Sequence, residues 1–496
     1  MNILILSAEV APLAKVGGLA DVAASLPIAL RASGHDARLV MPGYAMALHQ
    51  ADFPATKIRD FRVEMCSGWS EWVALYEIDL HGVPVYLIGC DMYFGKATES
   101  AKVYTEGYDQ YLFFAKAALA LSAELEWPID VVHANDWHTA FAPVFMREHD
   151  ALEWDHVASI FTIHNLAYQG EFGIDVLDRA GLPRSLYNMH QLETYGSVNF
   201  LKGGCVYADQ VNTVSPTYAR EIQTAEYGCR LEGLMKHLDA YGRLHGILNG
   251  IDTEEWNPAT DPHLHNHFSA SDPSGKAACK RELAAELGLD VSDETPLMGV
   301  VSRLSSQKGM DLLLNVADRL IPAGGRLIVQ GLGDAWLAEQ FRELAQRHPR
   351  HFAFAERFDA ALAQRVYAGC DLFLMPSAFE PCGLGQMIAL RYGTVPVVRQ
   401  TGGLADTVFE GVNGFVFEER SSEPFWQALQ RAFAAFADPE KWSNLRQGAL
   451  EGDYGWERSA AEYVKLFEAA IAHRQLPDRL GVPSRSVGSP VPLAEA

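Results

Sequence analysis

The sequence predicts an α/β protein built from two doubly wound domains, each a parallel sheet with helices on both faces. Residues 371–407 alternate a short apolar strand, a polar loop, a helix and a β-branched strand, which is the βαβ pattern of a parallel sheet. The same alternation opens the chain and starts again near residue 245. A chain of 496 residues also exceeds what one hydrophobic core normally serves, so two domains are expected.

Each element of this pattern has its own signal in the residues. Short apolar runs predict strands at 2–7, 37–41, 130–135, 159–163, 210–214, 297–301, 326–330, 352–355, 371–376 and 394–398, with antiparallel strands over 58–95. Helical spacing of apolar residues predicts helices at 20–32, 108–125, 276–287 and 456–473. We therefore expect an N-terminal domain over 1–245, a C-terminal domain over 246–455, and a Pro- and Ser-rich disordered tail over 475–496.

Charge and cysteine usage exclude several classes of partner. The formal net charge is −23, which disfavours nucleic acid and anionic membranes as partners. The seven cysteines are scattered without a CxxC pair, a pattern typical of a reducing cytosol and of no structural zinc site. The N-terminus resembles a strand more than a signal peptide, and no stretch reaches the ~18 apolar residues of a membrane span. We predict a cytoplasmic protein.

Polar side chains follow the predicted strands, where an open α/β sheet binds its ligand. His164 follows the strand at 159–163, and Glu380 lies in the loop after 371–376. Glu380 fits either a sugar-binding carboxylate or a helix-capping acid. Asp136, after the strand at 130–135, fits a ligand group and a helix cap equally well.

Three cations of this acidic chain also stand at strand ends: Lys15, Arg303 and Lys308. A nucleotide diphosphate that leaves develops negative charge, which fixed cations and helix N-termini can neutralise in place of a metal ion. No acid pair is suitably placed for a divalent metal, so neither a metal nor a cofactor is predicted. The alternative is that Arg303 and Lys308 are solvated loop residues.

The five residues Gly-Gly-Leu-Ala-Asp occur twice, at 17–21 and 402–406. Each copy is expected at a strand-to-helix turn, where free N–H groups suit an anion. The alternative is that each glycine pair only permits tight packing of helix on sheet. Cys382, near a helix start, is expected to fill space; activation as a nucleophile is the alternative.

Seven strings in order resemble the bacterial and plant glycogen/starch synthases: KVGGLADV, HANDWHT, FTIHNLAYQG, NTVSPTYAREI, GILNGID, SRLSSQKG and EPCGLGQMIALRYGTVPVVRQTGGLADTV. The similarity covers residues 1–470. It implies a GT-B fold, two Rossmann-like domains facing a deep cleft, with the last helix packing back on the N-terminal domain. It also implies metal-free transfer of glucose from ADP-glucose to the non-reducing 4-OH of an α-1,4-glucan such as glycogen, with retention of configuration.

The resemblance assigns roles to motif residues. Those expected to act in catalysis are His164, which positions the glucose 6-OH, Arg303 and Lys308 at the distal phosphate, and Glu380 at the glucose hydroxyls. Those expected to bind substrate are Lys15, Gly17, Gly18 and Asp21 in the first motif, Asp136 and Asn249 in the sugar pocket, Phe358 at the adenine, and the backbone of Cys382, Gly383 and Leu384.

Three positions depart from the family pattern. Phe358 stands where a tyrosine is usual, so stacking should survive without a hydroxyl contact. Gly385 replaces a usual threonine, which removes one contact on the phosphate side. The segment 91–107 differs from the commoner pattern, so the acceptor contacts there are not assigned.

Rival hypotheses remain open on sequence alone. A nicotinamide-dependent oxidoreductase would share the sheet pattern, but the first turn lacks the GxGxxG fingerprint. A non-catalytic glucan-binding relative, or an enzyme that uses UDP-glucose, is also compatible with the motifs. The sequence does not decide whether the chain forms a homo-oligomer.

Overall fold

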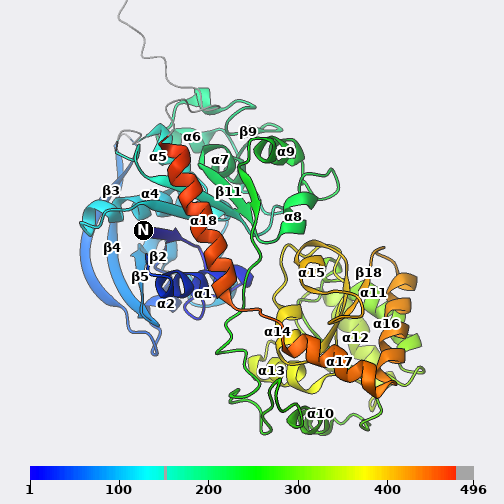
Figure 1. The fold of residues 1–496 in the computed structure, drawn as a ribbon. Helices are drawn as coiled ribbons and strands as arrows, with labels where there is room; N and C mark the ends of the chain where they lie inside the picture. The colour runs from blue at the N-terminus through cyan, green and yellow to red at the C-terminus, as the bar shows by residue number, and fades with distance from the viewer. Residues whose placement is uncertain (67, 150–152, 476–496) are drawn as a thin grey trace, which may run out of the picture.

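The computed structural model describes residues 1–66, 68–149 and 153–475. Two large sheets organise these residues, one in each half of the chain (Figure 1). The first has nine strands in the order β12-β11-β7-β6-β1-β2-β5-β4-β3, and the second has six in the order β15-β14-β13-β16-β17-β18. This pair of α/β sheets confirms the predicted fold class.

The first sheet is parallel from β12 to β5 and ends in an antiparallel extension, β4 and β3. Its strands are β1 (Asn2–Leu6), β2 (Asp36–Pro42), β3 (Thr56–Cys66), β4 (Trp69–Leu80), β5 (Val83–Gly89), β6 (Val131–Asn135), β7 (Ala158–Ile163), β11 (Gln210–Thr213) and β12 (Leu244–Gly246). The hairpin between β4 and β5 turns on His81 and Gly82, both with positive φ, as a two-residue turn of this kind requires. The antiparallel strands predicted over 58–95 are therefore confirmed.

Helices connect the parallel strands of this first half. They include α1 (Gly18–Ala32), α4 (Asp109–Glu124), α5 (Phe141–Glu148), α7 (Phe200–Tyr207), α8 (Pro216–Glu221) and α9 (Glu232–Ala240). A small three-stranded sheet, β8 (Glu171–Phe172), β9 (Glu193–Thr194) and β10 (Ser197–Asn199), lies beside them. The sequence pattern did not predict this small sheet.

The second sheet is parallel throughout. Its strands are β13 (Leu297–Val301), β14 (Arg326–Gln330), β15 (Phe352–Ala355), β16 (Leu372–Met375), β17 (Val395–Arg399) and β18 (Phe415–Phe417). Its helices are α10 (Gly275–Glu286), α11 (Met310–Leu320), α12 (Ala335–Arg347), α13 (Ala360–Gly369), α14 (Gly385–Arg391), α15 (Gly402–Thr407), α16 (Ser422–Phe436) and α17 (Pro439–Leu450). The apolar runs of its central strands are buried on both faces, as parallel sheets require.

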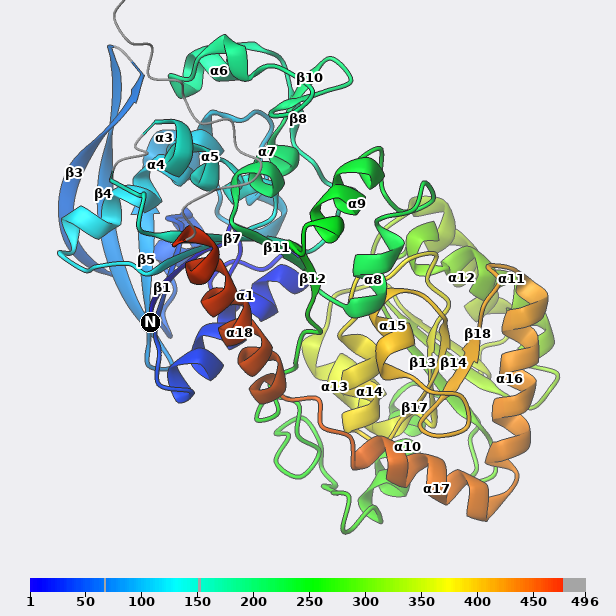
Figure 2. The same ribbon diagram turned by 45° about the horizontal axis from the view of Figure 1, so that its top comes forward.

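The last helix, α18 (Trp456–Arg474), leaves the second half and lies along the first (Figures 1 and 2). Its apolar face packs with Ile3, Ile5, Val22 and Leu26 into one buried cluster. The side chain of Asn212 also donates a hydrogen bond to the hydroxyl of Tyr463, at 3.1 Å. Residues far apart in sequence thus complete one core.

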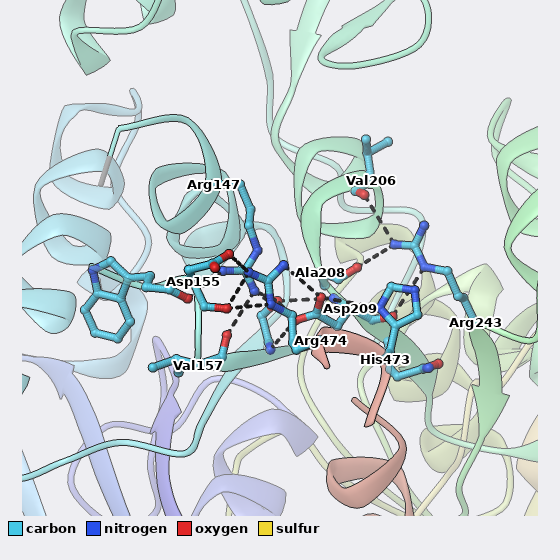
Figure 3. A network of polar contacts seen from close by, with 12 residues as sticks. Arg147, Asp155, Val157, Val206, Ala208, Asp209, Arg243, His473 and Arg474 are labelled. Carbon is cyan, nitrogen blue, oxygen red and sulfur yellow. Dashed lines mark hydrogen bonds and ion pairs between the residues drawn. The ribbon is translucent and has the colours of Figure 1, made fainter. Parts of the chain in front are cut away.

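A buried polar network holds the end of α18 (Figure 3). The carboxylate of Asp209 lies 2.8 Å from the guanidinium of Arg147 and 3.5 Å from that of Arg474. Burial alone would raise the pKa of Asp209, but His473, Arg147 and Arg474 together hold it below its ordinary value. This charge is therefore compensated, as a buried carboxylate must be.

The chain crosses between the halves twice, after β12 and before α18. The two crossings touch, because the amide of Ile251 donates to the carbonyl of Tyr454 at 2.8 Å. Of the tail predicted over 475–496, only Gln475 lies among the described residues. Within the described part of the chain, no helix combines the length and apolar character needed to span a membrane.

Candidate active site

In the first half, the ends of β6 and β7 bring Asp136 and His164 together. The backbone N–H of His164 donates to Oδ1 of Asp136 at 2.8 Å. Asp136 itself adopts φ 56° and ψ 174°, a region that side-chain-bearing residues avoid at a cost of ~1–3 kcal/mol. Burial raises the pKa of Asp136 to about 7, against the lowering effect of two backbone N–H groups. Strain and a raised pKa together are typical of a functional position.

The protonation of His164 follows from its neighbour. The Asn135 amide donates from Nδ2 to the carbonyl of Leu6 at 3.0 Å, so its Oδ1 is the acceptor that faces Nε2 of His164 at 2.9 Å. Nε2 therefore carries the proton, and Nδ1 is left as an acceptor. Burial lowers the pKa of His164 to about 3, so the ring is neutral at physiological pH. In this arrangement Nδ1 can accept a hydrogen bond from a hydroxyl group.

A buried acid shapes the loop that carries the first glycine pair. The carboxylate of Glu9 accepts the backbone N–H groups of Val16 and Gly17 at 2.6 and 2.7 Å, and a hydrogen bond from the Tyr104 hydroxyl. Lys15 next to it is exposed and pairs with Asp21 at 2.6 Å. Sequence reasoning missed Glu9 and Tyr104. The only local signal for Glu9 was an acid following an apolar strand.

In the second half, Lys308 and Glu380 form the central pair. Lys308 Nζ lies 2.9 and 2.6 Å from the two carboxylate oxygens of Glu380, and Ser377 donates to the same carboxylate at 3.2 Å. Glu380 is buried. Lys308 follows β13 and Glu380 follows β16, which are neighbours in the sheet. The sheet therefore brings together, at the carboxyl ends of its strands, two residues that are 72 positions apart in sequence.

The loop after Glu380 is closely packed. Cys382 is buried, and burial raises the pKa of its thiol to about 12, which favours the space-filling role over that of a nucleophile. The backbone N–H of Asn249 bonds to this sulfur, while Oδ1 of Asn249 is buried without a hydrogen-bond partner among the described residues. Gly383 has φ 76°, and Leu384 precedes α14. The free Oδ1 suits a ligand hydroxyl.

The second glycine pair does not face a ligand, and the hypothesis that it binds an anion is wrong. Gly402 donates its N–H to the carboxylate of Glu221 at 3.0 Å, and Gly403 donates to the carbonyl of Glu380 at 3.2 Å. A Cβ on Gly402 would lie 1.9 Å from the carbonyl oxygen of Glu380. These glycines are required for close backbone packing.

Several contacts join the two halves beside the site. A Cβ on Gly18 would lie 3.8 Å from Cδ1 of Leu384, which places the first glycine pair over the start of α14. On the α8 side, Ser215 donates to the carbonyl of Pro381 at 2.6 Å, and the N–H of Thr217 donates to Asp406 at 2.8 Å. The site therefore contains residues from both halves.

Arg303 and Phe358 stand at the carboxyl ends of β13 and β15 and extend into solvent. Phe358 is 79% exposed, so its ring is free to contact a ligand. Arg303 is exposed and forms no ion pair within the described ranges. Of the three predicted cations, Lys15 and Lys308 each pair with a carboxylate, whereas Arg303 has no ion pair among the described residues.

At Gly385, where a threonine is usual in the family pattern, two aromatic side chains limit the space. A Cβ there would lie 3.2 Å from the Phe373 ring and 3.3 Å from the hydroxyl of Tyr367. Both contacts are tight, so a threonine at this position would require Phe373 or Tyr367 to shift by a few tenths of an ångström. Residue 385 and residue 367 consequently constrain each other.

Comparison with known proteins agrees with this geometry. The family described as starch synthase catalytic domain matches residues 2–237, and the family described as glycosyl transferases group 1 matches residues 295–435. Glycogen synthases from Syntrophotalea carbinolica and Desulforudis audaxviator are 43% and 42% identical to this chain over 489 residues. Each alignment covers 95% of this chain, with 99% and 97% of the respective relative.

Solved structures show the same architecture. The catalytic domain of starch synthase IV from Arabidopsis thaliana, bound to ADP and acarbose, has a TM-score of 0.87 and 34% identity, and the match covers 95% of this chain and 99% of that one. The sucrose-phosphate synthase from Thermosynechococcus elongatus shares the fold, with a TM-score of 0.56 at 17% identity. With its two facing α/β sheets of the GT-B type, this chain belongs to the glycogen synthase family of glycosyltransferases.

Proposed function

We propose that this protein transfers glucose from ADP-glucose to the non-reducing 4-OH of an α-1,4-glucan such as glycogen, with retention of configuration. The observation that carries the proposal is the Lys308–Glu380 pair at the strand ends of the second sheet, beside the glycine loop of the first. The bond from glucose C1 to the diphosphate oxygen breaks and a bond to the acceptor oxygen forms. The departing phosphate takes the hydroxyl proton on the same face.

On the phosphate side, the charge is neutralised by side chains. Lys308 uses two donors on Glu380 and keeps a third for the distal phosphate. Arg303, exposed in the same loop after β13, adds a planar guanidinium that suits a phosphate. Lys15, with the loop of Gly17 and Gly18, approaches from the other half. Phe358 offers an uncovered ring on which an adenine could stack.

On the sugar side, the acceptors are already oriented. Nδ1 of His164 accepts the glucose 6-OH, and Oδ1 of Asn249 and the Asp136 carboxyl accept further hydroxyls. Glu380 binds glucose hydroxyls and stabilises positive charge that develops at C1. Lys308 compensates the charge of this buried carboxylate through their ion pair.

The two halves divide the work in this proposal. Residues 1–245 together with α18 bind the acceptor glucan and also contribute Lys15 and Asp21. Residues 246–455 bind the sugar nucleotide. Cys382, Gly383 and Leu384 offer backbone N–H groups at the boundary. We also propose a cytoplasmic location, since all seven cysteines are unpaired, as a reducing compartment favours.

The test is an initial-rate assay on a short maltooligosaccharide with ADP-glucose and UDP-glucose side by side. We expect the ADP sugar to be preferred. Lys308→Ala and Glu380→Ala should each lower kcat about 100-fold or more, because each removes one partner of a buried pair that faces the reaction.

The matched control is Lys465→Ala, which removes an exposed lysine paired with Glu462 at 2.8 Å on α18. It should leave kcat unchanged. Near-normal rates in both site variants would contradict the assignment of the site. Absence of glucose incorporation from either nucleotide would favour a non-catalytic glucan-binding protein, and faster use of UDP-glucose would overturn the donor.

A further inference from the structure

A cavity lies in the same half of the molecule as Lys308, at the amino ends of the strands of the second sheet. It has a volume of about 770 Å³, within the range of small-molecule sites. Pro296, Ala323 and Asp371 line it, and they precede β13, β14 and β16. The proposed active site follows the same strands, so roughly 15 Å of strand separates the two sites.

Charged side chains line this cavity. Lys276, Lys280 and Asp371 are buried there, and Arg446 is half-buried. Three basic side chains therefore share the buried part of the lining with one carboxylate. The acids Asp293 and Glu294 are exposed and lie at its rim.

The two lysines are already satisfied. Lys280 pairs with Asp371 at 2.8 Å, and Lys276 donates to the carbonyls of Ala368 and Tyr392 and to the hydroxyl of Thr394. Burial lowers the pKa of Lys276 to about 7; Asp371 opposes this shift and the charge of Arg446 adds to it. An anion in the cavity would offset the repulsion between Lys276 and Arg446.

Arg446 is the cation that lacks a partner. Its Nε is shielded from solvent and has no hydrogen bond, and no ion pair to another described residue forms. The charge of Asp371 acts on this guanidinium, but its buried Nε donor is left unsatisfied, which is costly. The planar donors of a guanidinium suit carboxylate or phosphate oxygens. The wall beside it is apolar and aromatic, formed by Phe433, Phe436 and Trp442.

We propose that this cavity binds a small organic anion, a phosphate ester with a ring, whose anionic group contacts Arg446 and whose ring packs on Phe436 and Trp442. The site is separate from the proposed active site. Neither the family match nor the proposed reaction requires it.

The probe is phenyl phosphate, titrated at constant ionic strength into the whole protein and followed by calorimetry and by melting temperature. We expect saturable binding to the wild type, and weaker binding of inorganic phosphate and of benzyl alcohol, which each supply half of the ligand. Arg446→Ala should weaken phenyl phosphate binding about tenfold or more.

Two further variants separate this cavity from the other phosphate site. Arg303→Ala should bind phenyl phosphate as the wild type does. Ser443→Glu places a carboxylate on the exposed, cavity-lining face of α17 and should compete with the anion even if Arg446→Ala does not fold. Lys441→Ala, an exposed change on the same helix, is the control.

Loss of phenyl phosphate binding in Arg446→Ala and Ser443→Glu, with retention in Arg303→Ala and Lys441→Ala, would support the proposal. It would be overturned by unchanged binding in both cavity variants, by loss in Arg303→Ala alone, or by no binding to the wild type at millimolar probe.

Discussion

The two copies of Gly-Gly-Leu-Ala-Asp have the same residues and the same place before a helix, yet different surroundings. At 17–18 the glycines are exposed, and a Cβ would meet nothing nearer than 3.9 and 3.8 Å. At 402–403 they are buried, and a Cβ would overlap backbone oxygens at 1.9 and 2.1 Å. The first copy keeps open space beside Leu384 at the start of α14, whereas the second is covered by the loop 380–382.

The difference shows that a glycine pair before a helix is not by itself an anion site. What lies over the amides decides their role. At 402–403 the N–H groups bond to Glu221 and to the carbonyl of Glu380, so the pair fixes the loop that carries the proposed catalytic acid. At 17–18 the N–H of Gly17 also bonds to a carboxylate, that of Glu9, but the two glycines themselves stay exposed. Four predictions sharpen or break this contrast.

The largest effect is expected for Gly402→Ala. The new methyl would overlap the carbonyl of Glu380 in a residue whose φ is 46°, so the free energy of unfolding should fall by about 3 kcal/mol or more. Gly17→Ala, the matched change in the first copy, should stay within ~0.5 kcal/mol. Urea denaturation compares the two. Equal losses would mean that the copies are structurally equivalent.

The next effect concerns the aspartates that end each copy. Asp406 accepts the N–H and the hydroxyl of Thr217, at 2.8 and 2.7 Å, across the contact between the halves. Asp406→Ala should cost ~1–3 kcal/mol. Asp21 pairs with exposed Lys15, so Asp21→Ala should cost at most ~1 kcal/mol while changing substrate kinetics. A larger loss for Asp21→Ala would reverse the contrast.

The acids at the site also differ between the two halves, and the pH dependence of stability tests this difference. Glu380 has Lys308 beside it, whereas Asp136 has no such cation in the described structure and burial raises its pKa to about 7. Between about pH 4 and 7 the folded state holds a proton that the unfolded state releases, so wild-type stability falls as pH rises through that window. Asp136→Asn removes this titration.

The stability of Asp136→Asn should therefore exceed that of the wild type by a margin that grows from pH 4 and levels off above pH 7. Urea midpoints at several pH values measure the margin. A margin that does not change with pH would show that Asp136 is ionised at acidic pH as well.

The smallest effect on stability is expected for Gly18→Ala. Its methyl would touch Leu384 at an ordinary 3.8 Å, so the melting temperature should hardly change. Because the methyl enters the space above the start of α14, KM for the sugar nucleotide should rise severalfold. Gly403→Ala, the counterpart, should destabilise the protein instead. Unchanged kinetics in Gly18→Ala would remove the first copy from the site.

Much of the fold followed from local pattern. β17 runs from Val395 to Arg399 where 394–398 was expected, because a β-branched run between turn residues has few other conformations. The position of the site at the carboxyl ends of the parallel strands was also predicted from sequence, because polar residues that follow such strands gather there. The burial of the second glycine pair could not be predicted from sequence. It depends on contact with the loop 380–382 and not on the glycines themselves.

The missed site residues share a physical cause. Glu9 accepts a hydrogen bond from Tyr104, 95 positions away. Glu221 accepts hydrogen bonds from Thr401 and Gly402, which lie in the other half. No local periodicity records such pairings. The strand order that sets β13 beside β16, and so Lys308 beside Glu380, is likewise a property of the assembled sheet. The positive φ of Asp136 has no signal in its neighbours.

The return of α18 to the first half has a consequence for biosynthesis. Its residues 456–474 cover Ile3, Ile5 and Val22, yet they leave the ribosome some 210 residues after β12 has formed. At ordinary translation rates the nascent N-terminal half would wait on the order of 10–40 s with this apolar face uncovered. That interval is when a chaperone would be needed, and a stop codon before 456 would make the exposure permanent.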